Sequence, residues 1–441
     1  MTKIGFISLG CSKNTVDTEV MLHRLMSAGY EITPEPTEAD IVVINTCAFI
    51  ESAKQESIDN ILDVAYLKEH HGLRGIVVCG CLGERYGAQI LEEMPEVDAV
   101  LGTGSYDDIV EAVRAVEKNK KGYFSHKDKN EAALGGERVL TTGESMAYLK
   151  IAEGCDNCCT YCAIPLIRGK FRSRPMEDIV AEARELDSIG VRELNIIAQD
   201  TSRYGLDLYG EYKLAELVKR ILEATSIPWI RLLYLYPDKI TDELIEVIKN
   251  NDRVVKYADI PIQHISDKIL KAMNRHGDGA MIRDAIARLR TAIPDITLRT
   301  TAIVGFPGET EEDFSELCEF IKETKFDRFG AFTYSQEEDT AAAEFDGQVD
   351  EQTKQDRYDI IMREQLYISA DKTASMVGKT LRVFCEGFDP VSETYFGRSE
   401  ADAPDVDGKI FFTSGKKLSD GVFVDVIITE ALDYDLIGKA I

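Results

Sequence analysis

Glu153-Gly-Cys-Asp-Asn-Cys-Cys-Thr-Tyr-Cys-Ala-Ile-Pro165 holds three cysteines, Cys155, Cys159 and Cys162, in the spacing C-x3-C-x2-C. Three thiolates this close in the chain can hold one corner of an iron–sulfur cube, which normally takes four Cys ligands. Three ligands leave one iron open, and an open metal position separates a catalytic site from a closed structural one. The stretch therefore predicts a 4Fe-4S cluster to which a further ligand can bind.

A fourth cysteine in the same stretch, Cys158, allows a second interpretation. Pairing Cys155 with Cys158, and Cys159 with Cys162, gives two C-x2-C units, as in a zinc knuckle or a redox dithiol. A zinc site usually takes its two pairs from separated segments, and two abutting pairs would strain the loop. We favour the cluster, with Cys158 outside the ligand set.

The composition is that of a chain with several hydrophobic cores. The 441 residues are 44% hydrophobic, which is enough for two or three domains. No apolar run approaches the roughly 20 residues that span a bilayer, and Met1–Phe6 enters a strand-like pattern rather than a signal peptide. Ten cysteines in clustered spacings indicate metal chemistry in a reducing compartment, so we expect a cytoplasmic protein with no membrane contact.

The charge is strongly acidic, with a net value of −27. Stable binding to nucleic acid is not expected, because it needs a basic surface. The charge suits a basic partner through electrostatic steering, although solubility alone is the commoner reason for an acidic surface. Seven acidic residues and no basic one lie between Glu337 and Glu351, which predicts a solvated loop.

The first 125 residues alternate short apolar runs with helical patterns. This rhythm predicts a doubly wound α/β domain around a parallel sheet. The expected strands are Lys3–Leu9, Asp40–Asn45, Gly75–Cys79 and Asp98–Leu101, and the expected helices are Thr15–Ala28, Ser52–Lys68 and Tyr106–Lys118. Polar, glycine-containing sequence follows, so residues 126–144 are predicted to be a linker.

Residues 145–372 repeat the β/α rhythm six times. This predicts an open, partial (β/α)6 barrel, with its site at the C-terminal ends of the strands. The expected strands are Tyr148–Ile151, Glu193–Ile197, Ile230–Leu235, Tyr257–Ile262, Thr297–Val304 and Arg328–Tyr334.

Residues 376–441 change period to short strands separated by Gly, Pro and Asp, which predicts a small antiparallel β-barrel. The expected strands are Thr380–Glu386, Tyr395–Arg398, Lys409–Thr413 and Gly421–Glu430. This segment has seven Lys and Arg against twelve Asp and Glu, a net of −5. A module that grips RNA phosphates should be basic, so the charge favours a basic protein as the partner.

A second set of three cysteines follows three strands of the N-terminal domain: Cys11, Cys47 and Cys81. In a doubly wound sheet, ligands bind at the carboxyl ends of the strands, where these cysteines would converge. A buried free cysteine is common for any one of them. Three at equivalent positions favour a second cluster held by three Cys ligands.

The cysteine motifs and several others resemble the methylthiotransferases, a branch of the radical S-adenosylmethionine (SAM) enzymes. The N-terminal motifs are Leu9-Gly-Cys11, Asn45-Thr-Cys47 and Gly80-Cys-Leu-Gly-Glu-Arg85. The triplet of residues 155, 159 and 162 is similar to the radical SAM motif, and Ala302-Ile-Val-Gly-Phe-Pro-Gly-Glu-Thr310 is similar to the family's SAM-contacting turn. The final barrel resembles a TRAM domain, so the resemblance covers essentially the whole chain.

The resemblance implies two 4Fe-4S clusters, SAM as cofactor and an electron donor protein as partner. In that family the first cluster cleaves SAM to make a radical that takes hydrogen from the substrate. The second cluster holds the sulfur that a second SAM methylates. The pattern identifies no catalytic side chain beyond these cofactors.

Two substrates occur within the family, an adenosine of transfer RNA and an aspartate β-carbon on protein twelve of the small ribosomal subunit. Asp259-Ile-Pro-Ile-Gln-His-Ile-Ser-Asp-Lys-Ile-Leu270 and Asn45-Thr-Cys-Ala-Phe-Ile-Glu-Ser-Ala-Lys-Gln-Glu-Ser57 resemble the second group. The resemblance therefore implies that the aspartate is the target. The nearest alternative is an enzyme of the first group, which modifies the transfer RNA adenosine. A non-catalytic iron–sulfur or zinc protein that binds RNA is a more distant alternative.

Six residues in the cluster loop, on a barrel strand and just after two strand ends are implied as SAM contacts. They are Tyr161, Gln199, Asp200, Arg299, Gly305 and Gly308. Tyr161 could stack on the adenine or simply pack within its loop. Arg299 needs an anionic partner, which could be the SAM carboxylate, the substrate aspartate or a protein carboxylate.

Overall fold

A six-stranded parallel sheet forms the N-terminal part of the computed structural model, which describes residues 2–441. The strand order is β2-β1-β3-β4-β5-β6. The strands are β1 (Lys3–Ser8), β2 (Glu31–Thr33), β3 (Ile41–Thr46), β4 (Gly75–Gly80), β5 (Ala99–Leu101) and β6 (Tyr123–Ser125). The helices are α1 (Ser12–Ser27), α2 (Glu51–His70), α3 (Cys81–Glu93) and α4 (Ile109–Glu117), with 3-10 turns η1 (Pro36–Glu38) and η2 (Tyr106–Asp108).

The four strands expected in this domain are all present, because their runs of Val and Ile are buried on both faces of the sheet. Strands β2 and β6 have three residues each and show no readable period. Helix α3 was also not expected, because it begins at Cys81 directly after β4 without a loop.

A partial barrel of six parallel strands follows. It consists of two three-stranded sheets, β11-β10-β7 and β12-β13-β14, which meet where the Leu235 amide donates to the Asp259 carbonyl at 2.8 Å. The strands are β7 (Met146–Lys150), β10 (Glu193–Ile197), β11 (Trp229–Leu232), β12 (Tyr257–Asp259), β13 (Thr297–Val304) and β14 (Arg328–Thr333). Two short strands, β8 (Ala152–Glu153) and β9 (Arg172–Ser173), form a separate antiparallel pair.

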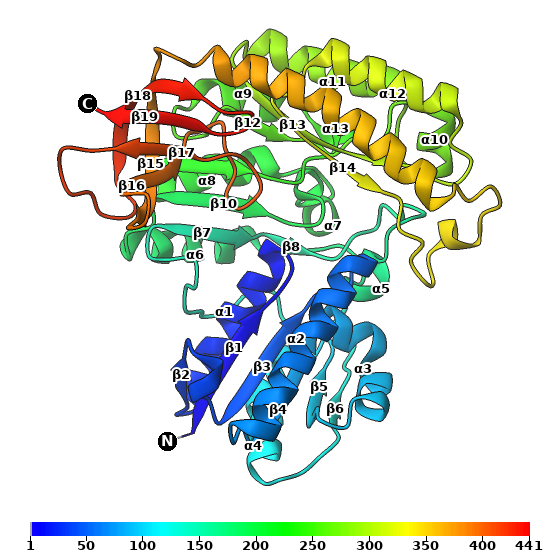
Figure 1. Ribbon diagram of the computed structural model, residues 1–441, viewed down its shortest axis with the longest axis vertical. Helices are drawn as coiled ribbons and strands as arrows, with labels where there is room; N and C mark the ends of the chain where they lie inside the picture. The colour runs from blue at the N-terminus through cyan, green and yellow to red at the C-terminus, as the bar shows by residue number, and fades with distance from the viewer. Residues whose placement is uncertain (1) are drawn as a thin grey trace.

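Helices lie between these strands and cover the outside of the barrel (Figure 1). They are α5 (Ile164–Arg168), α6 (Met176–Ser188), α7 (Leu206–Tyr209), α8 (Leu214–Ala224), α9 (Asp242–Asn250), α10 (Asp267–Ala272), α11 (Gly279–Ala292), α12 (Glu311–Thr324) and α13 (Glu351–Ala374). The 3-10 turns are η3 (Thr201–Arg203), η4 (Pro237–Lys239) and η5 (Ala341–Glu344). The largest hydrophobic core lies between these helices and the six strands.

The C-terminal residues form a closed barrel of five strands in the order β15-β16-β17-β19-β18. The strands are β15 (Thr380–Asp389), β16 (Thr394–Arg398), β17 (Ile410–Thr413), β18 (Phe423–Ala431) and β19 (Leu436–Ala440). The last strand was not expected. The barrel is anchored on β10 by Glu193, which is fully buried and pairs with Arg398 and Arg231.

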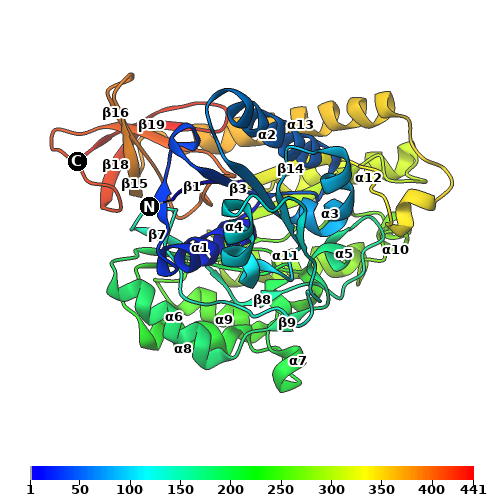
Figure 2. The ribbon, with the colours of Figure 1, turned by 90° about the horizontal axis from the view of Figure 1, so that it is seen from below.

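The N-terminal domain lies across the open side of the partial barrel, as the views from the side and from below show (Figures 1 and 2). In the described chain, residues 126–144 contain no helix or strand. They are nevertheless held in place, since Arg138 pairs with Glu19 of α1 and with Glu182 of α6. Among residues 2–441, no helix has the length and apolar character needed to cross a membrane.

Candidate iron–sulfur and substrate site

The first cysteine triplet lies in the loop between β8 and α5. Cys155 and Cys159 are buried and Cys162 is half-buried. Burial raises the pKa of the Cys155 thiol to about 11, with smaller contributions from the charges of Asp200 and Cys159. Burial also raises the pKa of Cys162, together with the charges of Cys159 and Cys155. The structure thus brings the three thiols within electrostatic reach of one another, in surroundings that disfavour bare thiolates and favour ionisation only with a metal present.

Within residues 2–441, no group of three or more His, Cys, Asp or Glu side chains is arranged around a point where one metal ion would bind. Cys158 is exposed, with a left-handed φ of 51°. Its carbonyl oxygen accepts a hydrogen bond from Asn274 Nδ2 at 3.0 Å. The turn therefore directs Cys158 outward while its neighbours Cys155 and Cys159 are buried.

Polar groups approach the sulfurs of this loop. Asn157 Nδ2 donates to Asp200 at 2.8 Å and lies 3.4 Å from Cys155 Sγ. Arg275 Nη1 lies 4.0 Å from Cys159 Sγ. An amide and a guanidinium beside the sulfurs fit a thiolate-bound cluster, because hydrogen bonds to the sulfurs stabilise its negative charge.

The second triplet lies at the C-terminal edge of the N-terminal sheet. Cys11 precedes α1, Cys47 follows β3, and Cys81 begins α3. Burial raises the pKa of Cys81 to about 12, the charge of Arg168 opposes this, and the charges of Cys47 and Cys11 add to it. The charges of the three thiols therefore influence one another.

A glycine makes this approach sterically feasible. Gly10 has a φ of +91°, and a Cβ added there would lie 2.9 Å from Cys47 Cβ and 3.2 Å from Cys47 Sγ. Any larger residue would clash with the Cys47 side chain in a backbone conformation that L residues rarely adopt. Gly10 therefore lets the backbone before α1 approach the Cys47 side chain closely.

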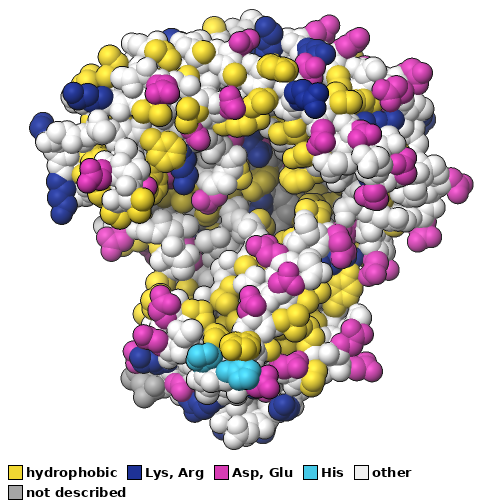
Figure 3. Space-filling model, in the orientation of Figure 1, with side chains coloured by type: hydrophobic (Ala, Val, Ile, Leu, Met, Phe, Trp, Pro, Cys, Tyr) yellow, Lys and Arg dark blue, Asp and Glu magenta, His cyan; other side chains and the backbone are white. Residues whose placement is uncertain are grey.

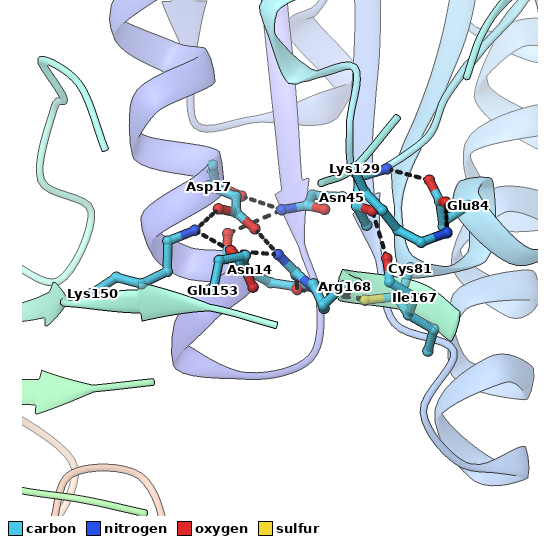
Figure 4. A network of polar contacts seen from close by, with 12 residues as sticks. Asn14, Asp17, Asn45, Cys81, Glu84, Lys129, Lys150, Glu153, Ile167 and Arg168 are labelled. Atoms are coloured by element: carbon cyan, nitrogen blue, oxygen red, sulfur yellow. Dashed lines mark hydrogen bonds and ion pairs between the residues drawn. The ribbon is translucent and has the colours of Figure 1, made fainter. Parts of the chain in front are cut away.

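A buried network of charges joins the two triplets (Figure 4). Arg168, the last residue of α5, pairs with Asp17 of α1 and lies 3.4 Å from Glu153 Oε2. Its Nη2 lies 3.7 Å from Cys81 Sγ. Lys150 bonds both carboxylates, Asp17 and Glu153. The helix that directly follows the first cysteine loop therefore reaches a sulfur of the second triplet.

Sequence reasoning missed this network. Its one local signal is that Asp17, Lys150 and Arg168 are charged residues within segments of otherwise buried pattern. The surface is hollowed between the N-terminal domain and the partial barrel, and Lys and Arg side chains are visible in its depth (Figure 3).

Gln199 and Asp200 follow β10 beside the first cysteine loop. Gln199 Nε2 donates to Glu153 Oε1 at 2.6 Å, and its buried Oε1 has no partner. Asp200 is fully buried and already bonds Asn157 and Lys239. Gln199 thus retains an acceptor for a ligand, whereas Asp200 supports the loop.

The glycine turn after β13 lies against Tyr161. The ring of Tyr161 packs edge-on to Phe306 at a centroid distance of 6.5 Å. Gly305 has a φ of +73° and its amide donates to Glu309 at 2.8 Å. Gly308 bonds the Gly347 carbonyl, and a Cβ there would meet nothing within 4 Å. Hydrogen bonds to Glu309 and Gly347 hold the turn in place, and the Tyr161 ring packs against Phe306 within it.

Two expectations need correction. Arg299 lies near the N-terminal end of β13, away from the cysteine loops, and pairs with Asp259 at 3.0 Å and Asp407 at 3.4 Å. Protein carboxylates therefore satisfy its charge, and we no longer assign it to a cofactor. The acidic loop is not simply solvated, because Glu337 is buried and pairs with Arg85 and Lys54 of the N-terminal domain.

Three families match consecutive parts of the chain. The Uncharacterized protein family UPF0004 matches residues 3–102, the Radical SAM superfamily residues 149–321, and the TRAM domain residues 377–441. The radical SAM match implies a 4Fe-4S cluster and SAM.

Solved structures share the fold at low identity. A radical SAM methyltransferase, TsrM from Kitasatospora setae, with cobalamin and a 4Fe-4S cluster bound, aligns with a TM-score of 0.56 at 14% identity, over 76% of this chain and 75% of that one. The cobalamin-dependent radical enzyme OxsB aligns with a TM-score of 0.52 at 13% identity, over 83% of this chain and 56% of that one. These similarities concern the fold alone.

Curated relatives match over the full length. The ribosomal protein uS12 methylthiotransferase RimO of Thermoanaerobacter sp. (strain X514) is 48% identical over 441 residues, which is 100% of both chains. The enzyme of the same name from Clostridium botulinum (strain Eklund 17B / Type B) is 50% identical, over 99% of this chain and 97% of that one. The one from Geobacter sulfurreducens is 48% identical, over 100% and 98%. With a parallel-sheet domain, a radical SAM barrel and a TRAM barrel in one chain, this protein belongs to the RimO family of radical SAM methylthiotransferases.

Proposed function

We propose that this protein adds a methylthio group to the β-carbon of an aspartate on ribosomal protein uS12. The observation that carries the proposal is the pairing of two cysteine triplets across one domain interface, with Arg168 reaching from the first loop to Cys81. Relatives of nearly half identical sequence that carry the uS12 methylthiotransferase name supply the substrate.

Each triplet is proposed to hold one 4Fe-4S cluster, with SAM at the open iron of the first. The residues fit these groups by their chemistry, since each set offers three free thiols and a basic side chain beside one of its sulfurs. When bound, a cluster of this kind with SAM supplies radical chemistry at unactivated carbon, which acid–base groups of the protein cannot supply.

In this proposal, the side chains of the protein bind and orient the cofactors and shield the cysteine sulfurs from water. Gln199 can accept a hydrogen bond from the cofactor through its free Oε1, while its amide is held by Glu153. Burial of Cys155, Cys159 and Cys81 keeps water away from the sulfurs. The network around Arg168 fixes the distance between the two loops, which a reaction that uses both centres requires.

The acidic character of the chain supports a basic protein as substrate. The net charge of −27 would steer a Lys- and Arg-rich ribosomal protein toward the enzyme and repel nucleic acid. An electron donor protein is also required, and the cytoplasm is the compartment where uS12 is made. The proposal therefore includes an electron donor protein as a partner and the cytoplasm as the location.

Mass spectrometry of purified uS12, after anaerobic incubation with reconstituted enzyme and SAM, tests the function. We expect the methylthio mass on one aspartate, and none with Cys159→Ala. Cys318→Ala serves as the matched control, because Cys318 is buried in the helix–strand core away from both loops. Transfer RNA is assayed in parallel, and modification of transfer RNA but not uS12 would refute the proposal.

Iron and acid-labile sulfide analysis tests the two clusters. The variant with Cys155, Cys159 and Cys162 all replaced by Ala should retain about half of the iron. Loss of all iron would contradict a second cluster, and one zinc per chain without sulfide would exclude radical chemistry.

A further inference from the structure

Lys13 is a buried lysine without a carboxylate partner. Its side chain belongs to a residue only 6% exposed, yet within residues 2–441 its ammonium makes no ion pair or hydrogen bond. Its Nζ lies over the ring of Tyr234, 3.0 Å from the ring centroid. Lys13 Nζ is not among the fully buried, unpartnered polar atoms of the described residues, so the ammonium remains accessible to solvent and can pair with an anion that binds from outside the chain.

The other buried lysines show that this is exceptional. Each pairs with at least one carboxylate: Lys54 with Glu51 and Glu337, Lys150 with Asp17 and Glu153, Lys239 with Asp200 and Asp238, and Lys354 with Glu351. The fold therefore neutralises lysines that serve structure. Lys13 is the one it leaves open.

The position of Lys13 links the two halves of the site. It lies in the first turn of α1, two residues after Cys11, and this turn has no acidic residue and no side-chain cap. The uncapped N-terminus adds positive potential. Tyr234 lies just beyond the C-terminal end of β11, the face at which barrels of this kind bind substrates.

Tyr234 is itself held in an unusual conformation. Its φ is +62°, which is rare for an aromatic residue and typical of functional sites. Asp259 accepts a hydrogen bond from its amide at 3.0 Å, and Thr201 donates to its carbonyl at 3.0 Å. Its hydroxyl lies 3.4 Å from Ser12 Oγ. The ring that faces Lys13 is thus fixed from both domains.

We propose that Lys13 binds the side-chain carboxylate of the aspartate that is modified, an inference that rests on the proposed function. The reacting β-carbon is bonded directly to that carboxylate, so an ion pair with Lys13 would hold the carbon beside the Cys11 loop. It would also select aspartate over asparagine, because an uncharged amide leaves the ammonium unpaired.

The test is a double-mutant cycle that compares wild-type and Lys13→Met enzyme, each with an Asp peptide and an Asn peptide. Anisotropy of a labelled peptide from the modified loop of uS12, with either Asp or Asn at the target position, reports binding without turnover. The reconstituted wild-type enzyme should prefer the Asp peptide by about tenfold to hundredfold. Lys13→Met should bring the ratio of dissociation constants close to one, chiefly by weakening the Asp peptide, and Lys13→Arg should retain much of the preference.

Lys127→Met is the matched control for the loss of one positive charge. Lys127 is exposed on the N-terminal domain and pairs only with Asp108, so the preference for Asp should persist. If Lys13→Met weakens both peptides equally, or neither, the inference is wrong. The Asp and Asn peptides on the wild-type enzyme test it even where a variant fails to fold, since equal affinities would also refute it.

Two further measurements test whether Lys13 pairs with an anion other than the substrate carboxylate. If Lys13 instead balances the charge of a metal centre at Cys11, Lys13→Met should change the iron content or the electron paramagnetic resonance spectrum and leave the Asp preference intact. If it binds SAM, SAM cleavage without peptide should fall. Either result overturns the inference. Failure of the wild-type enzyme to modify uS12 would refute the proposed function itself, whereas normal modification with unchanged preference in Lys13→Met would refute only this inference.

Discussion

At the scale of single residues, exposure distinguishes two neighbouring cysteines that the sequence alone does not. Cys158 and Cys159 are adjacent, but the left-handed φ at Cys158 directs it outward, while Cys159 is buried beside Arg275. Cys159→Ala should therefore lose about half of the iron, and Cys158→Ala should retain all of it. Iron and sulfide analysis after anaerobic reconstitution measures this, and equal losses in the two variants would show that Cys158 is a ligand.

At the scale of one element, helix α12 has a complete capping box. The Asp313 amide donates to Thr310 Oγ1 at 3.3 Å, and the Thr310 amide donates to Asp313 Oδ2 at 3.0 Å. Thr310→Ala should lower the stability of the helix by about 1 kcal/mol. Faster amide hydrogen exchange in the first turn of α12 would reveal it, and Thr324→Ala at the other end of the helix should leave that turn unchanged. An unchanged exchange rate in Thr310→Ala would contradict the role of the cap.

The same cap has a defined pH dependence. Burial would raise the pKa of Asp313, but bonds from Lys268, Thr310 and Ser266 outweigh it and hold this pKa well below the ordinary value of 3.8. A carboxyl with a lowered pKa stabilises the folded state fully above its ordinary pKa and progressively less as the pH falls below it. Wild type should therefore be more stable than Asp313→Asn at pH 7, with the difference shrinking below about pH 3.8. Urea unfolding at a series of pH values measures it, and a difference that grows toward acid would be the opposite of this expectation.

At the scale of the whole molecule, buried charges hold the domains together. Arg168→Met would leave Asp17 and Glu153 with Lys150 as their common counter-ion. Removing one partner from a buried ion network costs about 3–5 kcal/mol, so the domain interface should open more readily. Hydrogen exchange in α1 and α5 would report this, with Arg168→Lys losing less. Protection equal to wild type would show that the network contributes little.

The C-terminal barrel depends on a second buried set of charges. Glu193, Arg231 and Arg398 are each at most 1% exposed, and the two arginines share the one carboxylate. Glu193→Gln should destabilise the docked barrel by about 3–5 kcal/mol, because Arg231 loses its carboxylate partner and Arg398 keeps only Glu386. Limited proteolysis near residue 376 would detect release of the barrel. Glu386→Gln, which removes a more exposed partner of Arg398, should have a smaller effect.

Much of the architecture, and the cysteine motifs, could be predicted from local patterns in the sequence. Strands Glu193–Ile197 and Thr297–Val304 have the bounds expected from the sequence. The first is buried at every position, and the second mostly alternates buried with half-buried residues. The spacing of Cys155, Cys159 and Cys162 is likewise a property of one loop. Such features depend on neighbours within about ten residues, and periodicity or spacing records them directly.

The pairing of charges across the chain depended on the tertiary structure. Arg168 meets Asp17 across 151 positions, Arg299 meets Asp407, and Lys13 lies over the Tyr234 ring with no ion pair to a carboxylate among residues 2–441. An ion pair leaves no period in the sequence, since any carboxylate that the fold brings near will serve. Local spacing therefore predicts which cysteines can hold metal, while the folded chain determined which buried charges already have a partner.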